Sequence, residues 1–171
     1  MKELGVLALV IVLFWYMLRS KGQKGGASPS SASSGITPYT PLSDSSTGND
    51  ALDNIMQAIF RFEGGKASDR NVVNNNPGNL RSGVGMTGTA GGYATYADVG
   101  DGWEGMQAWV VSHANAHPEW DFYDMFSYYL GGGTGKLPEG GQAKADQYAD
   151  YVASYGGFDP TQSVWEAMGM Q

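Results

Sequence analysis

The chain has 171 residues, with 17 Asp and Glu against 10 Lys and Arg and a formal net charge of -7. That length suits one domain with an appendage, and the scattered basic residues argue against a nucleic-acid partner, because phosphate binding needs clustered Lys and Arg. The absence of Cys excludes a disulfide framework and a Cys-based metal site, while 5 Trp, 10 Tyr and 6 Phe can fill one core and still line a groove.

The N-terminal region predicts a membrane anchor over residues 1–19. Residues 4–18 carry no charged side chain. As a helix they rise about 22 Å, at about 1.5 Å per residue, so flanking charges must snorkel to complete a span. A cleaved signal peptide is the alternative, since the length suits its apolar region. The anchor is favoured because Arg19, Lys21 and Lys24 follow at once, and such charges hinder export of what comes after them.

Residues 20–48 are predicted to form a flexible tether. They are rich in Gly, Ser, Pro and Thr and have little to bury. A flexible chain of this length has an expected root-mean-square reach of about 30 Å. The folded domain is predicted to cover residues 49–171.

The first helix of that domain is predicted over residues 50–63, with Asn49 or Asp50 as its cap. Glu63 falls on the apolar face of this helix at its last turn. Desolvation and the negative end of the helix dipole favour the protonated carboxyl there, which suits a general acid. A solvated Glu before a glycine stop at Gly64 is the alternative from periodicity alone. The apolar stripe consists of Leu52, Ile55, Met56, Ile59 and Phe60.

Residues 82–100 are glycine-rich and predict a loop or short hairpin. Apolar periodicity predicts further helices over residues 101–116, 121–130 and 142–155. A last helix is predicted to begin with Asp159 as its N-cap. The expected inner faces of these helices carry Trp103, Met106, Val110, Phe122, Met125, Phe126, Tyr129, Ala145, Tyr148, Ala149, Val152, Val164, Trp165 and Met168. Trp109 is expected in the core or in a groove wall.

Two motifs in this region resemble a metal site and a phosphate loop, but each lacks residues that such a site needs. His113 and His117 have the i, i+4 spacing of a helical metal site, but no third ligand is evident and Pro118 ends the helix. The glycine run 131–136 lacks the first Gly and the final Ser or Thr of a phosphate loop, and it is expected to form a loop at a groove rim. We therefore expect no metal and no cofactor.

A family resemblance rests on two segments. The helix ending in Glu63 is followed by Asn-Asn-Pro-Gly-Asn-Leu-Arg over residues 75–81. Together they resemble the lysozyme-like lytic transglycosylases, in the form carried by bacteriophages. Leu137-Pro138 with Tyr148 and Val152 is similar to the family's Leu-Pro and Tyr-Val element. The chain departs from the pattern at Gly64, where many members have Ser or Thr, and at residues 127–131, which replace Ala-Tyr-Asn-Ala-Gly.

The resemblance covers roughly residues 50–171 and implies a mainly α, lysozyme-like domain that acts on peptidoglycan. It implies that Glu63 is the catalytic acid. Glycoside cleavage normally uses two carboxylates, whereas this family works with one Glu and forms a 1,6-anhydro product. The residues expected to bind substrate or order the site are Asn76, Asn79, Arg81, Tyr96 and Tyr148. Candidates for a second carboxylate, which spacing alone does not rank, are Asp69, Asp98, Asp101 and Glu104.

Two alternatives from other classes stay open at this point. The domain could be a hydrolytic muramidase, with water replacing the C6 hydroxyl of the sugar, or a noncatalytic glycan-binding or structural module of a virion. The positive-inside rule places the basic residues after the anchor on the cytoplasmic side. We expect a single-pass protein of a virion internal membrane that opens the host wall during genome entry, with virion membrane or capsid proteins as further partners. The alternative is a bacterial inner-membrane protein facing the periplasm.

Overall fold

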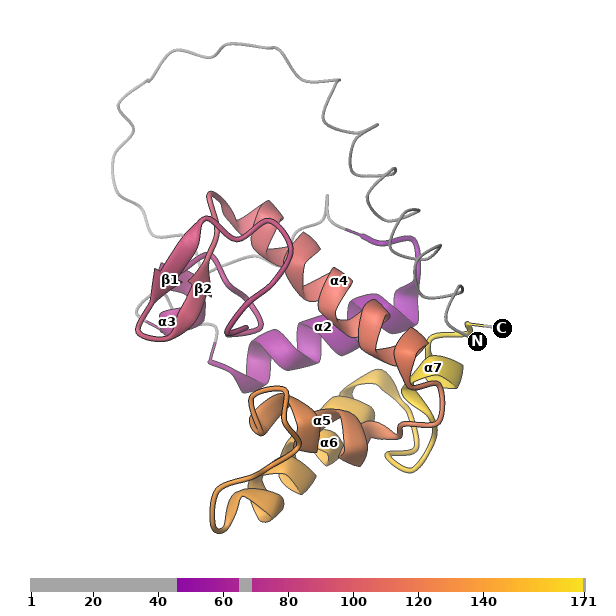
Figure 1. Cartoon of the computed structure of the whole chain (residues 1–171). Coiled ribbons are helices and arrows are strands. Elements are labelled where there is room, and N and C mark those ends of the chain that lie inside the picture. Colours follow the sequence, from indigo (N-terminus) through magenta and orange to yellow (C-terminus); the bar gives the residue numbers. More distant parts are fainter. Residues whose placement is uncertain (1–45, 65–68, 171) are drawn as a thin grey trace, which may run out of the picture. The chain divides into compact units, whose positions relative to one another are not determined.

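A computed structural model describes residues 46–64 and 69–170, all within one compact unit. This part of the chain is mainly helical and carries one two-stranded sheet (Figure 1). The predicted mainly α class is therefore confirmed. The expected anchor over 1–19, and the tether up to residue 45, lie outside the described residues. Among the residues that are described, no helix has both the length and the apolarity needed to cross a bilayer.

Helix α2, Asp50–Phe62, is the central element of the domain. Its N-cap is Asn49, whose Oδ1 accepts a hydrogen bond of 3.1 Å from the Leu52 N–H, and its predicted apolar stripe is buried. The residues just before it are also tied to the helix, because the Thr47 N–H donates to the Asp53 carboxylate at 3.0 Å. Ser46 and Thr47 thus both contact Asp53 of α2.

Among the described residues, the other helices of more than four residues are α4, Val99–Ala116; α5, Phe122–Leu130; and α6, Gly141–Gly156. Helix α6 packs against both α2 and α5, and α4 packs on α2 from another side (Figure 1). Helix α4 begins two residues before the predicted start, because the Asp98 side chain caps it by accepting from the Asp101 N–H. The largest fully buried apolar side chains are Tyr148, Phe122, Phe126, Ile55, Ile59, Met106, Met125, Val110, Val152 and Val164.

The small elements lie next to the C-terminal end of α2. Helix α3, Arg70–Val73, is a single turn that the sequence did not predict. Strands β1, Gly88–Ala90, and β2, Tyr93–Thr95, pair antiparallel with Gly88 opposite Thr95. The predicted hairpin is confirmed, and two glycines with positive φ form its turn, Gly91 and Gly92.

The start of the last helix differs from the prediction. Helix α7 is Val164–Ala167, and its N-cap is Ser163, which accepts from the Glu166 N–H. Asp159 instead accepts from the Thr161 N–H at 2.9 Å and from the Thr161 hydroxyl at 2.7 Å. Asp side chains bond readily to the backbone two residues on, which makes a local turn rather than a helix start.

Candidate active site

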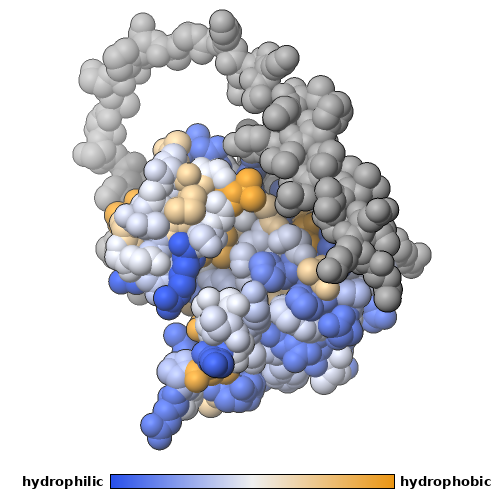
Figure 2. Space-filling view, viewed as in Figure 1, coloured by the Kyte–Doolittle hydropathy of each residue, from blue (hydrophilic) through white to orange (hydrophobic). Residues whose placement is uncertain are grey.

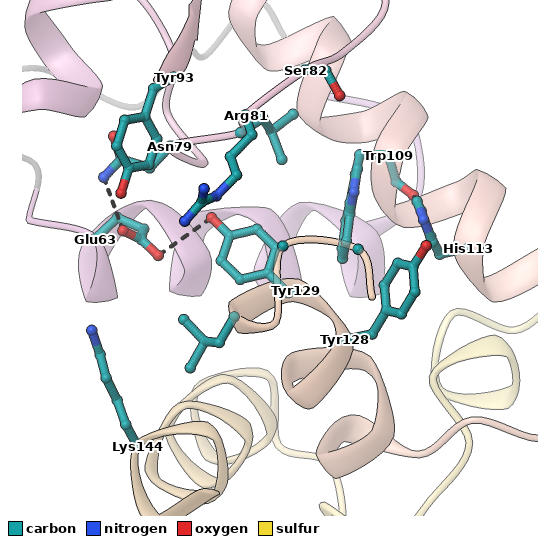
Figure 3. A pocket seen from close by; sticks show the side chains of 14 residues that line it. Glu63, Asn79, Arg81, Ser82, Tyr93, Trp109, His113, Tyr128, Tyr129 and Lys144 are labelled. Atoms are coloured by element: carbon teal, nitrogen blue, oxygen red, sulfur yellow. Dashed lines mark hydrogen bonds between the residues drawn. The ribbon is translucent and has the colours of Figure 1, made fainter. Parts of the chain in front are cut away.

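Glu63 stands directly after the last residue of α2 and serves as its C-cap. Its N–H donates to the Ile59 carbonyl at 3.0 Å, so its backbone continues the helical pattern for one more residue. Gly64 then turns the chain away with a φ of +130°, a conformation that suits glycine. The partly buried Glu63 side chain is thereby directed toward the space between α2, α5 and the loop after α3 (Figure 3).

Three uncharged donor groups lie within hydrogen-bond distance of the Glu63 carboxyl. Asn79 Nδ2 donates to Oε2 at 2.9 Å, and the Tyr148 hydroxyl donates to Oε1 at 3.0 Å. The Tyr129 hydroxyl approaches the same Oε1 at 3.3 Å (Figure 3). Burial and the nearby Glu63 charge raise the pKa of Tyr129 well above its ordinary value, and burial followed by the charges of Tyr129 and Glu63 does the same for Tyr148. Both phenols therefore stay protonated.

Tyr129 also joins α5 to the loop beside Glu63. Its hydroxyl donates to the Gly78 carbonyl in a short hydrogen bond as well as facing Glu63. A phenol has one proton, so it donates to one of these acceptors at a time. The position of this hydroxyl is consequently fixed by two independent parts of the fold.

Asn76 organises the loop from the inside. Its side chain is fully buried, with Nδ2 donating to the Leu80 and Ala94 carbonyls at 2.8 and 2.9 Å and Oδ1 accepting from the Leu80 N–H at 2.9 Å. These bonds satisfy the amide and hold the loop against the hairpin. The sequence predicts that Asn76 binds substrate or orders the site, and these bonds agree with the ordering role, since Asn76 does not line the pocket. It has a supporting role because its polar groups are used within the loop.

Tyr96 is likewise a supporting residue. It is 4% exposed and its ring lies against Gly83 and Gly105, where an added Cβ would collide with the Tyr96 hydroxyl. Burial raises the pKa of this phenol. The expectation that Tyr96 contacts substrate is not met, because its ring fills the space between the loop and α4.

An open pocket of about 290 Å³ lies in front of the Glu63 carboxyl. Asn79 and Arg81 line it at the positions that the sequence indicated, whereas Tyr148 lies behind Glu63 and reaches the site through its hydroxyl alone. Gly132 and Gly133 form part of the rim, as predicted for the glycine run. The lining residues are Glu63, Asn79, Leu80, Arg81, Ser82, Tyr93, Trp109, His113, Tyr128, Tyr129, Leu130, Gly132, Gly133 and Lys144.

Glu63 is the single carboxylate in that lining. Of the other carboxylates considered from the sequence, Asp98 caps α4, Asp101 lies in its first turn, and Glu104 does not line the pocket. The Asp69 carboxylate lies against Gly64, the residue after Glu63, but is not part of the pocket lining. Within residues 46–64 and 69–170, no group of three or more His, Asp and Glu side chains is arranged to hold a metal ion.

Aromatic rings form the wall opposite Glu63. The Trp109 and His113 rings stack with centroids 4.3 Å apart, and Tyr128 lies 5.3 Å from His113 (Figure 3). His113 Nδ1 is 2.7 Å from the Trp109 carbonyl, which can only accept, so Nδ1 is the donor in this hydrogen bond. Such a wall offers apolar faces on which sugar rings stack.

No family model, curated protein or solved structure matches this chain.

The sequence had not identified several residues of the pocket. Tyr129 was assigned to the core because its helical spacing follows Phe122 and Phe126, yet its hydroxyl reaches Glu63. Its position within residues 127–131, the segment compared with the family's Ala-Tyr-Asn-Ala-Gly element, was the signal that could have indicated this role. Tyr93, Ser82 and Lys144 carried no such signal, because each is brought to the pocket by tertiary packing.

Proposed function

We propose that this domain is a lytic transglycosylase that cleaves the β-1,4 bond between MurNAc and GlcNAc in peptidoglycan. The observation that carries the proposal is a single pocket carboxylate, Glu63, held by Asn79, Tyr129 and Tyr148 and facing an aromatic wall. A lysozyme-like fold and membership of the phage-type family belong to the same proposal. They are supported by the helix that ends in Glu63 and by the segment over 75–81.

In the first step, Glu63 protonates the glycosidic oxygen as the C1–O bond breaks. Both tyrosine hydroxyls face Oε1, whereas Oε2 receives only the Asn79 amide. Since each carboxyl oxygen has two lone-pair positions, Oε2 retains a position for the proton that is transferred. Oδ1 of Asn79 is buried and has no hydrogen-bond partner in the described part of the chain, so the part of this amide that acts on the site is the Nδ2 group bonded to Glu63.

In the second step, the Glu63 carboxylate accepts the proton of the sugar's own C6 hydroxyl. The C6 oxygen then bonds to C1 of the oxocarbenium-like intermediate, giving the 1,6-anhydro product and restoring the acid. One carboxylate suffices for both steps. A hydrolase of the usual kind needs a second carboxylate about 5 to 9.5 Å away, and the lining of this pocket supplies none.

The test is mass spectrometry of purified peptidoglycan incubated with the full chain or with the Glu63→Gln variant. We expect anhydro-muropeptides from the unaltered protein and none from the variant, which keeps the shape of the side chain but cannot carry the acid proton. Reducing-end products would instead identify a muramidase. Intact glycan that still binds both proteins would identify a noncatalytic module.

For the cellular context, we propose that the enzyme is anchored through residues 4–18 in a virion membrane and acts on the host wall during genome entry. The basic residues 19–24 and the phage-type motif support this placement. Protease mapping of the domain in sealed membrane vesicles tests its orientation. Protection of the domain inside vesicles of inverted orientation would contradict the cytoplasmic placement.

A further inference from the structure

The charge of the pocket is opposite to that of the whole chain. The chain carries 17 acidic and 10 basic side chains, yet the described residues that line the pocket include two cations, Arg81 and Lys144, and one carboxylate, Glu63. Acidic residues are thus concentrated elsewhere on the molecule. A pocket that is locally cationic within an acidic protein favours an anionic ligand, because the local potential guides which ligand enters.

The two cations reach the pocket from separate elements. Arg81 follows the loop that carries Asn79, and Lys144 projects from α6 toward Glu63 from the opposite wall (Figure 3). The Arg81 guanidinium lies 5.8 Å from the centroid of the Tyr93 ring, a contact that restrains its orientation. The part of the chain that the structure describes offers neither cation an ion pair, so both remain available to a ligand.

The face of the domain that is visible and coloured in Figure 2 is mostly polar. Hydrophilic and weakly polar residues cover most of the visible face in Figure 2, and apolar residues occur in small separate areas. The ligand implied by the lining therefore combines sugar-like faces for the aromatic wall with a carboxylate for the two cations. Glycan strands of peptidoglycan have this combination, whereas a polymer of N-acetylglucosamine alone has no carboxylate.

We propose that Arg81 and Lys144 bind a carboxylate of the glycan substrate, so that the pocket selects anionic strands over neutral ones. This inference rests on the proposed function for the identity of the glycan. The carboxylate can come from the lactyl group of MurNAc or from the stem peptide attached to it. Arg offers a planar, forked set of donors that suits a carboxylate, and Lys adds a point charge from the other wall.

The test measures dissociation constants of the full chain for three kinds of glycan strand. These are strands with stem peptides, strands freed of peptide so that the lactyl carboxylates are exposed, and freed strands whose lactyl carboxylates are converted to neutral amides. We expect binding to anionic strands to be about 3- to 10-fold tighter than to amidated strands, the range for two partly exposed charge pairs. Tighter binding to strands with stem peptides would assign the carboxylate to the peptide, and tighter binding to the freed strands would assign it to the lactyl group.

Variants test whether the two cations cause this preference. In the Arg81→Gln/Lys144→Gln double variant the affinity ratio between anionic and amidated strands should fall close to one, and Arg81→Lys should retain part of it. Arg61→Gln is the matched control, because Arg61 is an exposed cation that lies over the Tyr155 ring, outside the pocket lining. Its ratio should equal that of the unaltered chain.

The inference is overturned if the unaltered chain binds anionic and amidated strands equally, or if Arg61→Gln lowers the ratio as much as the double variant does. Cleavage of the same strands is recorded separately. Carboxylate-selective binding without cleavage would refute the enzymatic proposal alone. Cleavage with no carboxylate preference would refute the present inference and leave the enzyme standing.

Discussion

Tyr148 contributes a hydroxyl to Glu63 from a side chain that is fully buried. Tyr148→Phe removes this donor while keeping the ring that packs in the core, so the loss of stability should be about 1 kcal/mol, the usual net value of one hydrogen bond. We expect kcat on peptidoglycan to fall about tenfold, equivalent to about 1.4 kcal/mol of transition-state stabilisation, with KM almost unchanged because Tyr148 does not line the pocket. Tyr123→Phe removes a surface hydroxyl bonded to Asp150 and is the control. An equal loss of kcat in both variants would contradict the assigned role.

Asn79 combines a left-handed backbone, with a φ of +49°, and an amide that donates to Glu63. Asn79→Gly and Asn79→Ala both remove the amide, but only Ala adds strain, of about 1 kcal/mol, in the left-handed region. Both variants should lose a similar factor in kcat, while thermal unfolding should show a lower midpoint for Ala than for Gly. If Asn79→Gly kept full activity, the amide would not be needed to orient Glu63.

At the scale of elements, the contact between α4 and the loop before Asn79 sets the position of the site. Gly102 of α4 lies so close to the loop that an added Cβ would overlap the Asn75 carbonyl and press on Pro77. Gly102→Ala should therefore move the loop and cost about 1–3 kcal/mol, as overpacking does. Gly100→Ala, in the first turn of the same helix, meets only the side chain of Asp98 and is the control. Chemical denaturation together with an activity assay measures both effects, and equal stability of the two variants would refute the prediction.

The helices could be predicted from the sequence because each buries one apolar stripe, as Leu52 and Ile55 show in α2. The polar loop could not be predicted in the same detail. A run of Asn residues usually indicates an exposed turn, and nothing local shows that Asn76 satisfies its amide by folding the loop on itself. The four-residue helix α3 was missed for a similar reason, since one turn has no periodicity to detect.

Some residues of the candidate site could likewise be predicted from local sequence, whereas others could not. Glu63 could be predicted because the end of an amphipathic helix and a following motif both indicate it. Tyr129 could not, because a tyrosine at core spacing can direct its ring inward and its hydroxyl toward a pocket at once. Lys144 lies 81 residues along the chain from Glu63, and only the packing of α6 against α2 brings the two to one pocket.

The free energy of unfolding should fall at alkaline pH, because the pKa of Tyr123 is raised in the folded protein. A hydrogen bond to Asp150 raises the pKa of Tyr123 to about 12. Below about pH 10, the ordinary tyrosine pKa, this phenol is neutral in both the folded and unfolded states. As the pH rises from about 10 to about 12 the unfolded chain ionises first, so the free energy of unfolding should fall across that window. Urea unfolding at several pH values measures this, and Tyr123→Phe should show a shallower decline than the unaltered chain. Identical slopes would exclude Tyr123 as a contributor.

The C-terminal end of the domain is a suitable point for attaching it to a surface or a fusion partner, because it lies beside the start of α2 and far from the pocket. Asn49 Nδ2 donates to the Met168 carbonyl at 2.8 Å, so the entry to α2 and the last described turn of the chain lie side by side. Glu63 stands at the other end of a 13-residue helix, about 20 Å away at about 1.5 Å per residue. A reporter protein or a surface linker joined at the C-terminal end would therefore leave the mouth of the pocket unobstructed. The domain could be displayed on a bead or a particle with its pocket accessible to insoluble cell-wall fragments.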